Sequence, residues 1–181
     1  MNLSVISLGH VHTDAIEPLT RHFARLEQIV TNATSRAELN RAIDAAANDW
    51  ILVVREHESV DDALAAEIAN AHNVWGYRIR TVAIYAGKPL RIGQPAELRL
   101  FHRRHLLRRG DLAVEGPVVR LEKALHAVTF ASYEEHRAHL QKHAVPHSTL
   151  RRVLLFLRNA RTLDANTLRY VWIEAGFDSG R

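Results

Sequence analysis

Three residues that could bind a metal ion directly follow the most apolar segment of the chain. Glu56, His57 and Glu58 come just after the apolar run 50–54 and Arg55. On an extended segment the two carboxylates point to one side, and carboxylate oxygens suit Mg²⁺ or Mn²⁺. We therefore predict Glu56, His57 and Glu58 as metal ligands. The competing interpretation is a charged turn in which Arg55 pairs with a Glu and repels a nearby cation.

Two more polar segments follow apolar runs that are typical of strands. Gly9 and His10 come after residues 3–8, and Asn32 comes after residues 26–31. Open α/β sheets bind ligands at the carboxyl ends of their strands. We therefore predict that Gly9, His10 and Asn32 line a ligand site. A turn with partly exposed imidazoles is the alternative for His10.

The densest basic cluster lies near the middle of the chain, in the segment His102-Arg103-Arg104-His105. Arginine binds phosphate and carboxylate through paired hydrogen bonds, so Arg103 is predicted to contact a diphosphate or an anionic acceptor. A charged loop is the competing interpretation. Nucleic acid is disfavoured because no aromatic ladder or known motif accompanies the cluster. Glu115, a nearby acid, is the candidate catalytic base.

The segments that must position these residues alternate between strand and helix patterns. Strands are predicted at 3–8, 26–31, 50–54, 77–85, 97–102 and 125–130, with helices at 13–23, 35–47, 60–71, 133–144, 148–160 and 164–175. The early alternation predicts an α/β fold with parallel strands. Ser35 and Glu38 have the spacing of a capping box. We predict an α/β domain over residues 1–145 and a helical C-terminal extension over 146–181.

The composition is that of an ordinary globular protein with a basic excess. The 24 Lys and Arg residues against 20 Asp and Glu give a net charge of +4, which favours an anionic partner. The absence of cysteine excludes disulfides and thiolate metal sites. We see no signal peptide pattern and no apolar run long enough to cross a membrane, and we expect a cytoplasmic location.

Three stretches, in order, resemble family-2 glycosyltransferases, which have the nucleotide-diphospho-sugar transferase fold. Residues 40–53, with Asn40-Arg41-Ala42-Ile43 and Asn48-Asp49-Trp50-Ile51-Leu52, are similar to the family's "RN-x-A" helix and "GDWIL" strand. Residues 76–79 and 95–103 resemble the "GY-x-I … P-x-x-RLFRR" segment of bacterial lipopolysaccharide-core enzymes. Residues 126–136 resemble the passage "H-Y-T-Y-x-S-x-E-E-Y". The resemblance implies a shortened, mixed-sheet domain of this fold with a nucleotide-sugar cleft after residues 8, 31 and 54.

The chain also departs from this family where the family's chemistry is done. The resemblance places a D-x-D motif, which holds the metal, where Arg55 and His57 stand, and Glu58 matches the Glu that follows it. A strand and loop of the nucleotide pocket are missing before the helix at Ser35. The family's "G-x-V-H-E" acid is absent from Gly116-Pro117-Val118-Val119-Arg120. The standard donor and metal site is therefore degenerate.

Two functions follow from this pattern. One is a divergent glycosyltransferase that takes a sugar from a nucleotide-sugar and uses Mg²⁺ or Mn²⁺. The other is a non-catalytic binding or assembly module that keeps the fold, with standard activity impaired or absent. The apolar stripe and arginines of residues 150–161 predict a helix that packs on the domain or on a second subunit, and we expect a homo-oligomer through the C-terminal helices. Peripheral contact with the inner membrane is the alternative for that helix.

Overall fold

A computed structural model gives the structure of the chain, and it describes most of the residues. The described residues are 2–9, 11, 13–71, 73–90, 95–108, 110–143 and 164–174. By its internal contacts the chain divides into two compact units. Unit 1 comprises residues 1–81 and 94–127, and unit 2 comprises residues 82–93 and 128–181. The predicted domain boundary after residue 145 lies outside the described residues and stays a prediction.

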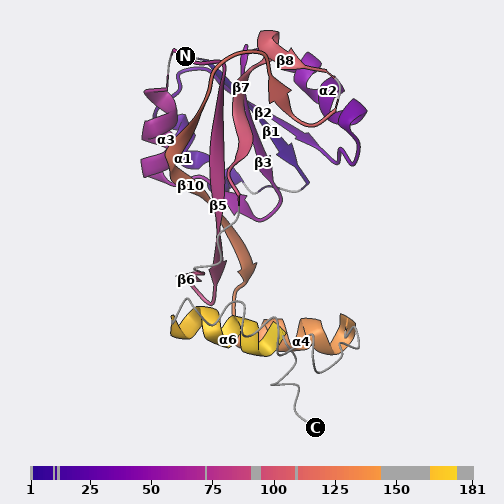
Figure 1. The fold of residues 1–181 in the computed structure, drawn as a ribbon, viewed down its shortest axis with the longest axis vertical. Coiled ribbons are helices and arrows are strands. Elements are labelled where there is room, and N and C mark those ends of the chain that lie inside the picture. Colours follow the sequence, from indigo (N-terminus) through magenta and orange to yellow (C-terminus); the bar gives the residue numbers. More distant parts are fainter. Residues whose placement is uncertain are drawn as a thin grey trace. The chain divides into compact units, whose positions relative to one another are not determined.

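A mixed β-sheet forms the centre of unit 1 (Figure 1). Its strand order is β2-β1-β3-β7-β5-β10-β4. Strands β1 and β2 are parallel, β1 and β3 are parallel, and β7 runs antiparallel to both β3 and β5. The strands of this sheet are β1 (Leu3–Leu8), β2 (Leu26–Thr31), β3 (Trp50–Arg55), β4 (Glu58–Ser59), β5 (Gly76–Tyr85), β7 (Glu97–His102) and β10 (Val118–Phe130). Strands β8 (Leu106–Leu107) and β9 (Ala113–Val114) pair separately.

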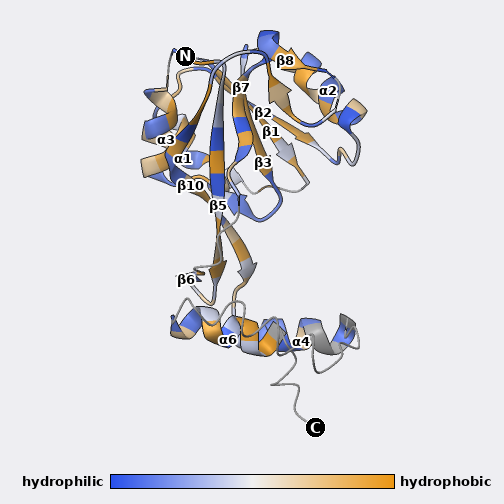
Figure 2. Ribbon diagram, viewed as in Figure 1, coloured by the Kyte–Doolittle hydropathy of each residue, from blue (hydrophilic) through white to orange (hydrophobic). Residues whose placement is uncertain are grey.

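Both faces of the parallel strands are covered, which explains why β3 is apolar throughout. Leu52 and Val54 pack in one hydrophobic cluster, whereas Ile51 and Val53 pack in another. Successive residues of a strand point to opposite faces, so a strand buried on both sides needs apolar residues at every position. Figure 2 accordingly shows hydrophobic colour along the parallel strands, whereas blue bands interrupt β5 and β7.

The helices of unit 1 lie on these two faces. Helices α1 (Glu17–Thr20) and α3 (Asp62–Ala69) contribute Leu19, Leu64 and Ile68 to the first cluster. Helix α2 (Arg36–Ala45) contributes Ala42 and Ile43 to the second. Figure 1 shows α2 on the side of the sheet opposite to α1 and α3.

The predicted capping box of α2 is confirmed. Ser35 Oγ accepts a hydrogen bond from the Glu38 amide at 3.3 Å, and the Glu38 carboxylate accepts one from the Ser35 amide at 3.0 Å. Helix α3 is capped by Asp61 and not by Ser59, the residue that precedes the predicted helix 60–71. Asp61 takes that position and accepts from the Leu64 amide at 2.7 Å, because Ser59 pairs with His126 in the sheet.

The predicted helix over 13–23 is wrong in most of its length. The segment forms a 3-10 turn, η1 (Thr13–Ala15), followed by the four-residue α1. The Ala15 carbonyl accepts from the Val60 amide at 2.8 Å, so a contact with a distant segment takes a group that a continuous helix would use. Strand β10 begins seven residues before the prediction, at Val118.

Unit 2 contains the ends of β5 and β10, the short strand β6 (Lys88–Pro89), and helices α4 (Tyr133–His143) and α6 (Ala165–Glu174). Tyr85 is fully buried at its centre. The Tyr85 ring contacts the rings of Tyr133, His136 and Tyr170 edge-on, at centroid distances of 5.3, 5.4 and 5.0 Å. Nδ1 of His136 lies 3.1 Å from the Tyr85 hydroxyl. These contacts hold α4 and α6 to the strand ends.

The predicted fold class is confirmed: the chain is an α/β protein with a mixed sheet flanked by helices and with helices near its C-terminus. The predicted helix at 148–160, with its stripe of apolar and arginine residues, lies outside the described residues. None of the described helices is long and apolar enough to cross a membrane.

Candidate functional site

The carboxyl ends of the parallel strands bring together some of the predicted site residues. The register pairs Leu8 with Thr31 and with Arg55, so Gly9, Asn32 and Glu56 follow three adjacent strand ends. The Gly9 amide donates to the Thr31 carbonyl at 2.9 Å, and the Glu56 amide donates to the Leu8 carbonyl at 2.8 Å. His10 is outside the described residues. This edge therefore has the arrangement that the sequence predicted for Gly9, Asn32 and Glu56.

A glycine is needed at position 9 for two reasons. Its φ of +84° lies in the left-handed region, which side chains disfavour. A Cβ atom there would also lie 3.0 Å from both Cβ and Oε2 of Glu56. The Glu56 side chain thus lies over Gly9, and it is about half exposed. Asn32 is exposed and lines a cavity of about 470 Å³ together with Glu38 and Arg41.

The chain turns after β3 and does not continue as the extended segment on which the metal prediction depended. Glu56 and His57 form a turn in which His57 has a φ of +64°, and its side chain is exposed. The turn directs Glu58 into the protein, where the residue is only 5 % exposed. Glu56 and Glu58 are consequently in different surroundings, one at the surface and one in the core.

Glu58 is the centre of a buried ion pair. Arg99 on β7, itself 2 % exposed, donates from Nη1 to Glu58 Oε2 at 3.2 Å and from Nη2 to Oε1 at 3.0 Å. The Thr81 hydroxyl donates to Oε1 at 3.1 Å, and the Arg55 amide donates to Oε2 at 2.8 Å. Burial lowers the pKa of Arg99 and the Glu58 carboxylate raises it, and a guanidinium stays protonated at neutral pH.

Glu58 therefore cannot bind a cation at this position without losing its pairing with Arg99. The side chain of Arg55 forms an ion pair with Glu97 at 2.7 Å. The competing interpretation, a charged turn in which Arg55 pairs with a Glu, thus describes this segment, and the partner is a Glu on β7. In the described part of the chain, no three His, Asp or Glu side chains converge as a metal site. As placed, Glu56, His57 and Glu58 do not fit a divalent cation.

The predicted Arg103 contact lies at the other end of the parallel strands. Asp49 precedes β3 and Glu56 follows it, so the length of β3, roughly 20 Å at 3.3 Å per residue, separates the two ends. Arg103 Nε donates to Asp49 Oδ1 at 3.0 Å, and its Nη1 donates to the Ala46 carbonyl after α2. Arg103 is thus far from Gly9 and Asn32, although all three were predicted to bind the ligand.

Glu115, the candidate base, is exposed and also lies apart from Glu56. Its amide donates to the His105 carbonyl at 2.8 Å, which places it with the segment that follows β7. Gly116 comes next with a φ of +121°, and any Cβ atom there would collide with the ring of Trp75. Glu115 therefore stands beside a packed aromatic segment, and nothing brings it to the carboxyl ends of β1 and β3.

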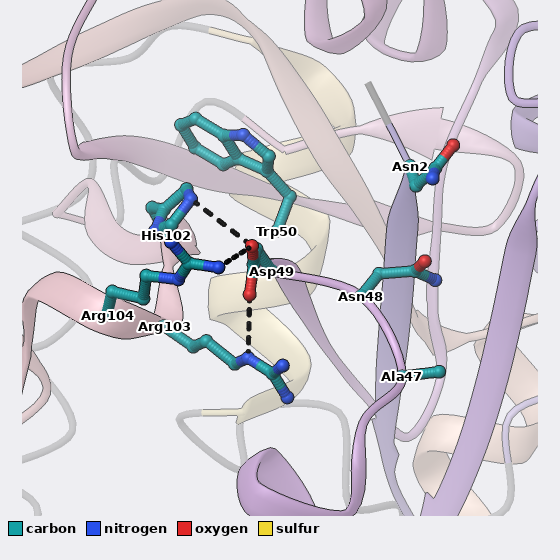
Figure 3. A pocket seen from close by; sticks show the side chains of 8 residues that line it. All are labelled: Asn2, Ala47, Asn48, Asp49, Trp50, His102, Arg103 and Arg104. Atoms are coloured by element: carbon teal, nitrogen blue, oxygen red, sulfur yellow. Dashed lines mark hydrogen bonds and ion pairs between the residues drawn. The ribbon is translucent and has the colours of Figure 1, made fainter.

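Around Asp49 the structure assembles a cluster that the sequence did not predict, here named the amino-edge site. Figure 3 shows the Asp49 carboxylate between Arg103, Arg104 and His102. Arg104 Nη2 lies 3.1 Å from Asp49 Oδ2, and His102 Nε2 lies 4.0 Å from the same oxygen. These side chains line an open cavity of about 470 Å³ with others: Asn2, Ala47, Asn48 and Trp50.

Aromatic rings surround His102 in the amino-edge site. The Trp50 ring meets the His102 ring edge-on at 5.5 Å, and Trp75 does so at 6.0 Å. Trp75 is also stacked on His105, with ring centroids 3.8 Å apart and planes 18° apart. Trp50, Trp75 and His102 line a second open cavity, of about 550 Å³. The site therefore combines an aromatic wall with guanidinium groups.

The charge of the amino-edge site is positive at neutral pH. Burial lowers the pKa of His102, and the nearby His105, Arg104 and Arg103 lower it further, whereas Asp49 raises it. His102 is therefore neutral at pH 7, because its ordinary pKa is 6.5. Two guanidinium groups face one carboxylate, so one positive charge remains. Such a site suits an anion.

Comparison with known proteins does not identify a family. No family model matches the chain, and no curated protein sequence matches it. Among solved structures, the chain is similar to the bifunctional IspDF from Campylobacter jejuni, at 12 % identity and a TM-score of 0.45. The match covers 68 % of this chain and 50 % of that protein. A likeness this distant says nothing about what this chain binds or catalyses.

The amino-edge site is not apparent from the sequence, because its parts are far apart in the chain. Arg103 and Arg104 were visible as a basic cluster, but Trp50 and Trp75 precede it by more than twenty residues. The pairing of Trp50 with His102 across β3 and β7 brings them together. One available signal was that Trp50 begins a predicted strand and Trp75 lies two residues before another, while Arg103 and Arg104 directly follow a third.

Proposed function

We propose that this chain is a non-catalytic binding module, a divergent relative of family-2 glycosyltransferases in which the metal and donor site has been lost. The observation that carries this proposal is the state of Glu58. The two Asp positions of the family's metal motif hold Arg55 and His57, and Glu58, which matches the Glu that follows them, is buried and paired with Arg99 on both carboxylate oxygens. The ordered sequence resemblance supports the family, and the geometry of Glu58 supports the loss of activity.

The family's chemistry requires that two phosphates be neutralised as the nucleotide leaves, and a divalent cation with hard oxygen ligands does this. With Glu58 bonded to Arg99, the strand ends offer Glu56 and the exposed His57 beside Arg55. One half-exposed carboxylate next to a guanidinium is a poor site for Mg²⁺, because the arginine repels the ion. The standard metal-assisted transfer thus has no support from these residues.

A divergent, active glycosyltransferase is the second candidate, and one observation favours it. Glu56 is half exposed and lies over Gly9 at the carboxyl ends of β1 and β3, where open α/β sheets bind ligands. Asn32 follows the adjacent strand. A nucleotide-sugar at this edge would meet Glu56 first, so Glu56 is the residue that distinguishes the two functions.

The test is a thermal titration of the purified chain with nucleotide-sugars, with Mn²⁺ and with EDTA. A ligand that binds the native state raises the melting temperature by mass action. The proposal expects no stabilisation that depends on Mn²⁺. Stabilisation by a nucleotide-sugar that requires Mn²⁺ and disappears in Glu56→Ala would overturn the proposal in favour of the transferase. Glu17→Ala, which removes a similarly exposed carboxylate from α1, is the matched control.

A further inference from the structure

One aromatic ring of the amino-edge site, that of Trp75, is partly exposed to solvent. Trp75 is 40 % exposed although one face of its ring is stacked on His105. It lines the 550 Å³ cavity with Trp50 and His102. Cavities of about 300–1,000 Å³ are the size of small-molecule sites in proteins. A flat ring placed in this cavity would contact Trp75.

Guanidinium groups stand on the other side of His102. Arg104 is 73 % exposed and uses one nitrogen for Asp49, so the rest of its planar donor group faces solvent. Arg103 is held in place by Asp49 and by the carbonyl of Ala46. A guanidinium carries five N–H donors, and arginines bind phosphate through pairs of them. The two cavities share Trp50 and His102, so the ring surface and the guanidinium groups adjoin.

His102, which the two cavities share, has an unsatisfied polar atom. Within the described residues, Nδ1 of His102 is buried and has no hydrogen-bond partner. A buried polar atom without a partner costs free energy, and native proteins seldom leave one unpaired. His102 itself lines both cavities, so it forms the wall that the two parts of the site share.

We propose that the amino-edge site binds a nucleoside monophosphate, with its base against Trp75 and its phosphate on Arg104 and Arg103. The base supplies the flat ring, and the phosphate matches the positive charge that Asp49 leaves unbalanced. This inference goes beyond the proposed function, because the site is at the opposite end of β3 from Glu56 and does not depend on whether the carboxyl ends retain activity.

The experiment uses tryptophan fluorescence, since two of the three tryptophans of the chain line the site. Trp172 lies in unit 2, and a Trp172→Phe background removes its signal. AMP, adenosine and inorganic phosphate are each titrated in EDTA at low salt. The proposal expects AMP to quench the emission with saturation, and adenosine and phosphate each to bind at least about tenfold more weakly.

Two variants test the two halves of the site. Arg104→Gln should weaken AMP about tenfold or more and leave adenosine unchanged, because a charge-assisted contact to the phosphate is removed. Trp75→Ala should weaken both AMP and adenosine about tenfold, because base stacking is lost. If Trp75→Ala does not fold, Trp75→Phe keeps a ring there and should weaken AMP less. Arg21→Gln, at an exposed arginine that also forms ion pairs and lines neither cavity, is the control, and Arg41→Gln tests the cavity beside Asn32.

Three outcomes would overturn the proposal. The first is no saturable effect of AMP at millimolar concentration. The second is equal binding of AMP by Arg104→Gln and the unmodified chain. The third is AMP binding that Glu56→Ala or Arg41→Gln weakens while Arg104→Gln does not, which would move the ligand to the carboxyl ends of the strands. That last result would also argue against the proposed function, whereas the first two leave it unaffected.

Discussion

Replacement of Glu58 by glutamine tests the role of the buried ion pair. Glutamine keeps the shape of the side chain and one acceptor oxygen but removes the negative charge. Arg99, at 2 % exposure, would then face only Glu97, whose carboxylate lies 3.3 Å from Arg99 Nε and is itself 45 % exposed. The hydrogen bond from the Arg55 amide would also weaken or be lost, because it now goes to a charged oxygen.

The expected loss of stability is large. Breaking a buried ion pair by removing one partner costs about 3–5 kcal/mol, because the remaining charge is left uncompensated. For a chain of this size each kcal/mol shifts the melting temperature by roughly 2–4 °C, so Glu58→Gln should melt about 6–20 °C lower. Glu97→Gln, which removes a half-exposed partner of the same arginine, should cost less than about 1 kcal/mol.

Urea unfolding in the Trp172→Phe background measures the effect in unit 1, since Trp50 and Trp75 then give the signal. Arg99→Met should be comparably destabilising, and Glu58→Gln with Arg99→Met should be less so than the sum of the two, because no unpaired charge remains. A loss below about 1 kcal/mol for Glu58→Gln, or additive losses in the double variant, would refute a structural role. Glu58 would then be free to serve as a ligand.

Three further predictions concern other residues. Burial raises the pKa of Tyr85 to about 12, so the folded chain keeps a proton that the unfolded chain loses above pH 10. The melting temperature should therefore fall between pH 10 and 12, and it should fall less in Tyr85→Phe. Burial lowers the pKa of His102, so the unfolded chain binds more protons than the folded chain below about pH 6.5. The free energy of unfolding, measured in urea, should therefore fall as the pH drops through that range, and His102→Asn should reduce this dependence on pH. Gly116→Ala places a Cβ atom against the Trp75 ring at a φ of +121°, so it should cost more than about 1 kcal/mol and shift the tryptophan emission, whereas Gly110→Ala, with open space around it, should leave the emission unchanged.

Elements whose structure is set by residues close together in the sequence could be predicted. The apolar run of β3 and the Ser35–Glu38 capping box follow from local patterns, and both are confirmed. The helix over 13–23 could not be predicted correctly, because its carbonyl at Ala15 bonds to Val60, forty-five residues away. The early part of β10 was missed because Val118 and Val119 are exposed and do not alternate as a half-buried strand does.

The environment of Glu58 shows why the site was harder to predict than the fold. From the sequence, a carboxylate after a buried strand has the position of a metal ligand. Its actual partner is Arg99, forty-one residues later, and only the pairing of strands across the sheet brings the two together. A charged residue at a strand end therefore has two uses, and the sequence does not distinguish a ligand from half of an ion pair.

The two arginines of the amino-edge site differ in how well their replacement tests ligand binding. Arg103 is partly buried and bonds to the Ala46 carbonyl and to Asp49, so its removal would disturb the end of α2 as well as any ligand. Arg104 is mostly exposed and forms an ion pair with Asp49. An exposed pair of this kind contributes little to stability. A loss of AMP binding in Arg104→Gln without a loss of stability would therefore report binding alone. Replacement of Glu58 does not separate the two effects, because the loss of its ion pair with Arg99 also destabilises the fold.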